Sequence, residues 1–213
     1  KNEYINNYNP NNISNNKSVV YFPSCITRSM GNSKGKSKEL ELTQITKLLI
    51  ERAGYTIIYP QDMNKLCCGM SFSSKGFVEA GKEASNKLEA ALYKASDGGR
   101  IPILCDMSPC LYTMKSNFGE RLELYEPAEF IIKYLIDNLT ISKLDKKVSV
   151  FAVCSAKKME VDHYLYQLAN LCAKEVTIID SNCCGFAGDR GFLVPELNQH
   201  GLRNLSAQTK GSQ

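Results

Sequence analysis

The tripeptide Cys-Cys-Gly occurs twice in this chain, at residues 67–69 and 183–185, and each copy precedes a short polar loop that ends in Gly-Phe. Successive side chains of an extended segment point to opposite sides, so two adjacent cysteines cannot share one ordinary packing role. A disulfide between such neighbours would also depart far from normal disulfide geometry. We therefore predict that both thiols of each pair face one soft metal centre.

Composition limits the kind of protein that such a centre could belong to. The chain has 213 residues, nine cysteines and a formal net charge of +4, with Lys and Arg scattered along it. An odd number of clustered cysteines is atypical of a secreted disulfide framework and favours metal ligation or redox chemistry. No basic stripe indicates nucleic acid, and no apolar run approaches the eighteen or so residues of a membrane span. We expect a cytoplasmic protein, with peripheral attachment to the inner face of the cell membrane as an alternative.

The chain divides into an Asn-rich first segment and two similar halves. Residues 1–17 hold few aliphatic side chains, so we expect a disordered linker that cannot bury enough surface to offset its ordering entropy. Residues 18–140 alternate expected strands and helices around the first Cys-Cys-Gly, and residues 141–213 restart the same order. We predict an α/β protein of two pseudo-symmetric repeats with short, mainly parallel sheets and flanking helices. The second repeat lacks a closing strand and cysteine pair, so we expect it to be incomplete at its C-terminal end.

The apolar pattern places cysteines just beyond the ends of the expected strands. We expect strands at 19–22, 55–59, 101–104, 122–125, 148–153 and 176–179. We expect helices at 42–53, 77–92, 127–138 and 158–173, and a last one from 195. Ser73 or Ser74 would cap the second of these helices. Because sites in open α/β sheets lie beyond the carboxyl ends of the strands, the cysteines that follow strands can converge there.

The cysteines divide into two sets of candidate metal ligands. The first repeat supplies Cys25, Cys67, Cys68, Cys105 and Cys110, and the second supplies Cys154, Cys183 and Cys184. Soft thiolate ligands favour iron–sulfur, zinc or Cu(I). One zinc ion needs only four ligands, so five thiols favour a multinuclear iron–sulfur cluster, with zinc as the alternative. Gly69 and Gly185 would let the backbone approach the cofactor and donate N–H groups to sulfur.

Other polar residues near these loops have simpler interpretations. Cys172 shares a helix face with apolar residues, and we expect a core thiol there. We place His163 and His200 on helices away from the cysteine loops and do not expect them to be ligands. The basic residues that flank the cysteines would offset negative charge or form a solvated rim: Arg28, Lys75, Lys157, Lys158 and Arg190. A local disulfide between Cys105 and Cys110 is an alternative under oxidising conditions.

The cysteine pattern resembles the cysteine-rich CCG domain that occurs twice in heterodisulfide reductase B subunits, in glycolate oxidase iron–sulfur subunits and in related 2-hydroxyacid dehydrogenases. Segments 21–25, 67–77 and 183–192 are similar in sequence to the C-terminal portion of bacterial FAD-linked D-lactate dehydrogenases, and the resemblance extends from Val19 onward. Two departures stand out. Four residues separate Cys105 from Cys110 where the family often has Cys-x-x-Cys, and the second repeat lacks its closing cysteine.

The resemblance implies a 4Fe-4S-type cluster held by these cysteines. It implies electron transfer from FAD, in the remainder of the protein or in a partner dehydrogenase subunit, to a quinone or cytochrome acceptor. The substrate would be a D-2-hydroxyacid such as D-lactate or glycolate. No flavin-binding segment is recognisable, so substrate oxidation is expected elsewhere in this FAD/iron–sulfur oxidoreductase. Two alternatives stay open: a heterodisulfide-type thiol–disulfide reductase subunit, and a zinc-stabilised interaction module without redox function.

Overall fold

The structure is a computed structural model that describes residues 17–30, 39–180, 183–186 and 188–212. The first repeat contains β1 (Ser18–Phe22), α1 (Cys25–Ser29), α2 (Leu42–Arg52), β2 (Thr56–Ile58), η1 (Met63–Lys65), α3 (Met70–Ser73), α4 (Val78–Ala95), β3 (Ile103–Cys105), α5 (Ser108–Phe118), η2 (Gly119–Arg121), β4 (Leu124–Tyr125), α6 (Pro127–Phe130), η3 (Ile131–Leu135) and η4 (Ile136–Asn138). The second contains β5 (Leu144–Val150), α7 (Cys154–Lys158), α8 (Asp162–Cys172), β6 (Ala173–Ile178), α9 (Arg190–Leu193), α10 (Pro195–Gly201) and α11 (Leu205–Gln208). The predicted α/β class is confirmed.

The first repeat is built on a parallel sheet with the strand order β2-β1-β3-β4. The central pair is in register from Val20 opposite Ile103 to Phe22 opposite Cys105. The chain leaves β1 through α2 toward one face of the sheet, and it leaves β3 through α5 toward the other. The carboxyl ends of β1 and β3 are therefore a topological switch point, where open α/β sheets form a crevice.

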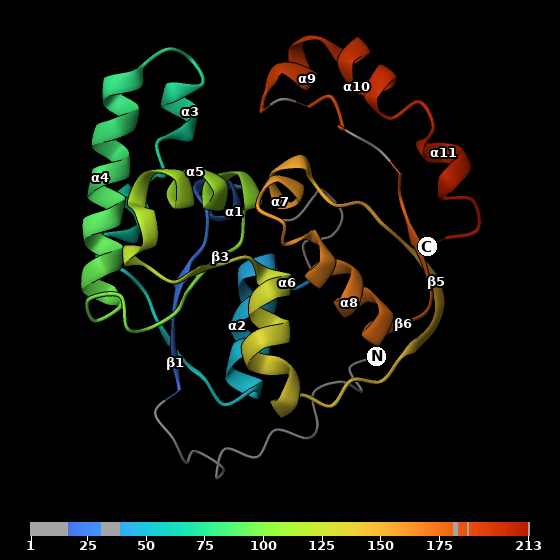
Figure 1. Cartoon of the computed structure of the whole chain (residues 1–213), viewed down its shortest axis with the longest axis horizontal. Helices are drawn as coiled ribbons and strands as arrows, with labels where there is room; N and C mark the ends of the chain where they lie inside the picture. The colour runs from blue at the N-terminus through green and yellow to red at the C-terminus, as the bar shows by residue number, and fades with distance from the viewer. Residues whose placement is uncertain (1–16, 31–38, 181–182, 187, 213) are drawn as a thin grey trace.

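Helices cover both faces of this sheet, as Figure 1 shows. Val20 and Phe22 of β1 pack with side chains of α4 and α5 in one core. Val19 and Tyr21, which point the other way, pack with side chains of α2 and α6 in a second core. Alternation along a strand accounts for this division, because successive side chains face opposite sides. A rigid three-layer frame thus holds the carboxyl end of the sheet.

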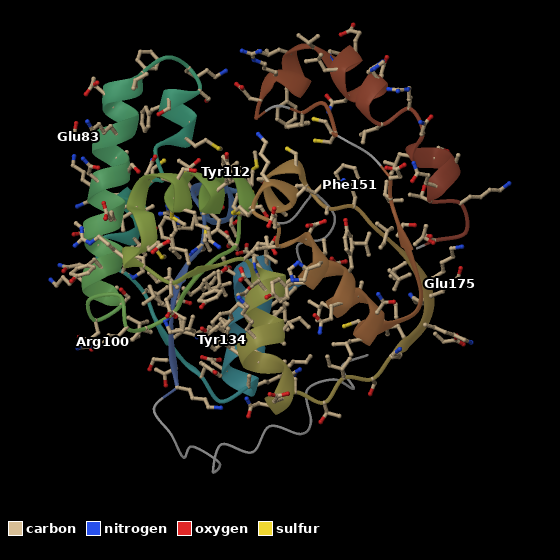
Figure 2. All side chains as sticks on the ribbon, viewed as in Figure 1. Glu83, Arg100, Tyr112, Tyr134, Phe151 and Glu175 are labelled. Carbon is tan, nitrogen blue, oxygen red and sulfur yellow. The ribbon has the colours of Figure 1, made fainter. Side chains whose placement is uncertain are left out.

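The second repeat copies the first in chain order. Its strands β5 and β6 pair in parallel, as β1 and β2 do. Helix α7 begins at Cys154 just as α1 begins at Cys25. It packs on α5 of the first repeat, where the Lys158 Nζ lies 5.6 Å from the centre of the Tyr112 ring; Figure 2 shows Tyr112 on the helix beside α7. The two repeats therefore contact each other near their cysteine loops.

Two sequence predictions need correction at the first Cys-Cys-Gly loop. The structure places a short helix, α3, directly after Gly69, where we expected only a loop. The long helix α4 then begins after Phe77 with no side-chain cap, so neither Ser73 nor Ser74 caps it. The cause is Gly76, whose φ of +89° breaks the helical path between the two helices.

Most of the predicted N-terminal linker, residues 1–16, lies outside the described residues. Lys17 is described, and its carbonyl oxygen accepts a hydrogen bond from the Thr56 N–H at 2.9 Å. The predicted repeat boundary after residue 140 falls between η4 and β5. Across the described ranges, the helices are all too short or too polar to cross a membrane.

Candidate metal centre

Two of the candidate ligands lie at the switch point of the sheet. Cys105 is the last residue of β3 and is fully buried. Cys25 is the first residue of α1, and Ser24 caps this helix by accepting a hydrogen bond from the Thr27 N–H at 3.2 Å. The register of β1 and β3 brings the two cysteine-bearing ends to one edge of the sheet.

The Cys67-Cys68 pair is shaped by the glycine that follows it. Gly69 has a φ of +86°, and a Cβ atom there would lie 2.1 Å from the carbonyl oxygen of Gly81 in α4. Only glycine allows this close approach of loop and helix. The Gly69 N–H donates a hydrogen bond to the Cys67 Sγ at 3.4 Å. Cys68 points into the core and is 4% exposed.

The five thiols of the first repeat are neighbours. Burial raises the pKa of Cys25, and the nearby Cys67 thiol adds to the effect. The pKa of Cys67 is raised first by its hydrogen bond with Cys68 and then by burial. A hydrogen bond with Cys110 raises the pKa of Cys68 to about 12. Burial raises the pKa of Cys105, with Cys68 and Cys25 contributing. Cys25, Cys67, Cys68 and Cys105 are thus protonated at neutral pH when no metal is bound, and a bound metal would have to displace those protons.

The donor set fits a thiolate-bound cluster by its chemistry. All nine cysteines are free thiols, which leaves the alternative Cys105–Cys110 disulfide unformed. As placed, no group of three or more His, Cys, Asp or Glu side chains in the described segments could hold a single metal ion. The ligands of a multinuclear cluster surround several metal ions rather than one, and five neighbouring soft donors suit such a cluster. The ligand roles of the eight cysteines stay a prediction.

Arg28 ties two cysteine-bearing segments together. Its guanidinium donates to the carbonyl oxygens of Pro23 and Ser24, beside Cys25, and to those of Met63 and Leu66, which lead into the Cys67-Cys68 pair. A planar guanidinium with several fixed donors suits this bridging role. Arg28 is therefore half-buried and bonded to the backbone, and it also lines the cavity beside Cys25 and Cys67.

A cavity of about 700 Å³ opens beside the outer thiols. Cys25 and Cys67 line it, together with Lys65 and with Lys87 and Glu83 of α4, and Figure 2 labels Glu83. Cys68, Cys105 and Cys110 are buried. The centre thus has an outer side that solvent reaches and an inner side within the core.

The second repeat reproduces the loop geometry with more exposed thiols. Gly185 has a φ of +75°, its N–H donates to the Cys183 Sγ at 3.3 Å, and a Cβ atom there would lie 2.1 Å from the Leu197 carbonyl oxygen of α10. Cys154 and Cys183 are exposed and Cys184 is half-buried. The loop is therefore a structural copy of the first one.

The structure also places the two histidines and Cys172, which we did not expect to be ligands. His200 lines a second cavity, of about 360 Å³, together with Cys183, so our placement of it away from the cysteine loops was wrong. Its helix folds back over the loop through the Leu197–Gly185 approach. His163 is exposed, with its Nδ1 atom 2.9 Å from the Glu160 carbonyl oxygen. Cys172 is half-buried at the end of α8, and burial raises its pKa.

One polar residue at the site was not predicted. Asp106 follows Cys105 and accepts hydrogen bonds from the β1 and α1 segments. Its position directly after a buried strand could have indicated a role at the site. The sequence could not indicate its hydrogen-bond partners, because they lie about 80 residues away along the chain.

Comparison with known proteins defines the class of the first repeat. Residues 19–115 match the model of the CCG family, described as a cysteine-rich domain. This segment, which runs from β1 into α5, is therefore similar to a CCG domain. It contains all five candidate ligands of the first repeat.

Curated relatives then relate the chain to particular proteins. It is 30% identical over 139 residues to the C subunit of the anaerobic glycerol-3-phosphate dehydrogenase of Escherichia coli (strain K12), a match that covers 59% of this chain and 35% of the relative. It is 23% identical over 194 residues to the lactate utilization protein A of Bacillus velezensis, covering 85% of this chain and 77% of that protein. The chain thus matches about a third of the length of the first relative. No solved structure gives a significant match.

Proposed function

We propose that this chain is the iron–sulfur electron-transfer part of a flavin-linked dehydrogenase that oxidises a D-2-hydroxyacid such as D-lactate or glycolate. The observation that carries this proposal is the group of five neighbouring thiols at the switch point of a segment similar to a CCG domain. Cys25, Cys67, Cys68, Cys105 and Cys110 would hold a 4Fe-4S-type cluster, which supplies one-electron transfer when bound. The relatives support a dehydrogenase setting, since one is named as a dehydrogenase subunit and another as a lactate utilization protein.

The chain's own residues would give the cluster a fixed protein environment. Gly69 directs its N–H group at the Cys67 sulfur, and hydrogen bonds to sulfur raise the reduction potential of a cluster. Arg28 holds two ligand-bearing segments in place. The cavity beside Cys25 and Cys67 gives one side of the centre access to solvent. FAD would be bound by another domain or by a partner dehydrogenase subunit, and a quinone or cytochrome would accept the electrons.

Anaerobic purification with iron, sulfide and zinc analysis and electron paramagnetic resonance (EPR) tests this proposal. We expect stoichiometric iron and sulfide and a reducible cluster signal. Cys67→Ser should remove that signal, whereas Cys172→Ser should leave it unchanged, because Cys172 lies at the end of α8 in the second repeat. Stoichiometric zinc with little iron and no redox transition would instead indicate a zinc-stabilised interaction module.

A second candidate function is favoured by the cavity beside the outer thiols. Cys25 and Cys67 line a space of about 700 Å³ in which a disulfide substrate could meet a thiolate or a cluster. A heterodisulfide-type reductase would reduce disulfides at this position. Disulfide reduction that Cys25→Ser abolishes would favour this function over electron relay alone.

A further inference from the structure

We propose that Asp106 is the positioning residue of the thiol centre, because its carboxylate fixes the Cys25 turn against the end of the strand that carries Cys105. Two experiments test this role. The EPR experiment rests on the proposed function, because it needs a bound cluster. The alkylation experiment concerns only the thiols of the metal-free chain.

Three donors from one segment converge on this carboxylate. The Ser24 N–H donates to Oδ1 at 2.8 Å, and the Thr27 hydroxyl donates to the same oxygen at 3.1 Å. The Tyr21 hydroxyl donates to Oδ2 at 2.9 Å. Hydrogen bonds to a charged acceptor are roughly twice as strong as neutral ones. Both oxygens are therefore engaged by the end of β1 and the start of α1.

The position of Asp106 joins two parts of the fold that diverge. The chain after β1 turns toward α2 on one face of the sheet, and the chain after β3 turns toward α5 on the other. Asp106 bridges the two at the point where they separate. It directly follows Cys105, the last residue of β3, and it reaches Cys25 through Ser24. Its hydrogen bonds thus determine the separation of Cys25 and Cys105.

The bridge also fixes the direction of the Cys25 helix. Ser24 and Tyr21 are both fully buried, so two of the three donors to Asp106 lie within the core rather than in solvent. The Ser24 Oγ lies 2.9 Å from the Thr27 Oγ1 and caps α1 through the Thr27 N–H. Because Asp106 holds the cap residue itself, it holds Cys25, the first residue of that helix.

The second repeat gives an internal comparison. Val153 takes the place of Ser24 before Cys154, and it makes no side-chain cap hydrogen bond. The Ser155 Oγ is buried and has no hydrogen-bond partner. Cys154 is exposed, whereas Cys25 is half-buried. The cysteine whose helix lacks a capping serine is thus the more exposed of the two.

Alkylation of the metal-free chain tests whether Asp106 holds the Cys25 turn in place. In Asp106→Ala, we expect iodoacetamide to modify Cys25 at least about tenfold faster, because losing charge-assisted hydrogen bonds frees the turn to open. Asp106→Asn should recover most of the protection, since its amide can still accept from Ser24 and donate to Tyr21. Asp145→Asn, an exposed carboxylate on β5, is the matched control and should match the wild type.

EPR of the iron-loaded chain is the second readout. We expect Asp106→Ala to change the g-values or reduce the cluster content, and Asp106→Asn to keep the native spectrum. If Asp106→Ala does not fold, Thr27→Val removes one donor from a half-buried position and should raise the alkylation rate of Cys25 in the same direction.

The outcomes separate this inference from the proposed function. Wild-type rates of Cys25 alkylation in both Asp106→Ala and Thr27→Val would overturn the inference. So would a native spectrum in a folded, iron-loaded Asp106→Ala chain. A wild-type chain without iron would overturn the proposed function alone, because the alkylation comparison would still report whether Asp106 holds Cys25.

Discussion

The backbone path of the first Cys-Cys-Gly loop depends on two glycines, Gly69 and Gly76, more than on its cysteines. Gly69 combines a left-handed backbone with a backbone contact to Gly81, so it has two independent reasons to be glycine. Gly76, in the same loop, has a φ of +89°, but a Cβ atom there would meet nothing within 4 Å. A comparison of substitutions at Gly69 and Gly76 therefore distinguishes the cost of the left-handed backbone from the cost of the steric overlap.

Gly69→Ala should destabilise the chain more than Gly76→Ala. A left-handed alanine costs about 1–3 kcal/mol at either position, and at Gly69 the methyl group would also overlap the Gly81 carbonyl oxygen. Urea unfolding of the two variants measures the difference. Equal losses of unfolding free energy would show that the loop and α4 separate freely.

Glu126 is a half-buried acid whose stability contribution should depend on pH. Burial raises its pKa above the ordinary 4.5, and the neighbouring Glu129 adds to this while Lys115 opposes it. An acid that binds protons more tightly when folded stabilises most below its unfolded pKa, and this contribution is lost as the pH rises through the folded pKa. Glu126→Gln stays neutral, so its stability relative to wild type should rise from pH 4 to pH 7.

Urea unfolding at the two pH values checks this expectation. A Glu126→Gln difference that is independent of pH would contradict the assignment. The amide that replaces the carboxyl group in Glu126→Gln can still accept the Ser108 hydroxyl hydrogen bond, which the Glu126 Oε1 accepts at 2.8 Å in the wild type.

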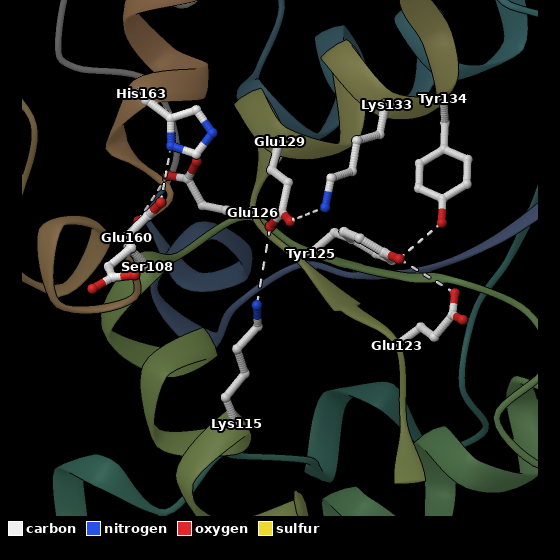
Figure 3. A network of polar contacts seen from close by, with 10 residues as sticks. All are labelled: Ser108, Lys115, Glu123, Tyr125, Glu126, Glu129, Lys133, Tyr134, Glu160 and His163. Atoms are coloured by element: carbon white, nitrogen blue, oxygen red, sulfur yellow. Dashed lines mark hydrogen bonds and ion pairs between the residues drawn. The ribbon is translucent and has the colours of Figure 1, made fainter. Parts of the chain in front are cut away.

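At the scale of elements, the helices that join the repeats hold a buried charge. The Glu129 side chain is 6% exposed, and the Lys133 Nζ lies 2.6 Å from its Oε1 atom, one turn along the chain (Figure 3). Lys115 of α5 lies farther away, at 4.0 Å from Oε2. The Lys133 Nζ also lies 5.2 Å from the ring centre of Tyr164 on α8. Lys133 thus links the first repeat to the second.

Lys133→Ala should lower the free energy of unfolding by about 1–3 kcal/mol, because it leaves a buried carboxylate poorly paired. Lys87→Ala is the matched control. It breaks a Lys–Glu pair of the same spacing, but the Glu83 side chain is 68% exposed, so the loss should be much smaller. Denaturant unfolding of both variants checks the contrast, and similar losses would mean that burial of Glu129 is unimportant.

Periodicity predicted most elements because apolar patterns and glycines act locally. The strands that precede Cys25 and Cys105 and the helix from Pro127 follow directly from such patterns. The helix α3 could not be predicted in this way, because it depends on the contact between Gly69 and Gly81. The carboxylate bridge of Asp106 was missed for the same reason: Ser24 is 82 residues away, and only the sheet register brings the two together.

At the scale of the whole molecule, the duplication places two similar loops beside each other. The polar loops after the two Cys-Cys-Gly tripeptides meet through Lys75 and Asp189, whose Nζ and Oδ2 atoms are 2.6 Å apart. Helix α7 also packs on α5, and Met159 packs against the core of the first repeat. Shared packing of this kind predicts that the two repeats unfold in one cooperative transition.

The Lys75–Asp189 ion pair tests whether the two loops face each other in solution. Both side chains are about half exposed, at 49% and 55%, so the pair should contribute little to stability and weaken with salt. Asp189→Lys should be destabilising, since it places two cations together, and adding Lys75→Asp should restore the attraction. A double-mutant cycle by urea unfolding at low and high salt measures this coupling. Because only facing loops allow the swapped charges to attract, strictly additive effects at low salt would mean that the two loops do not meet.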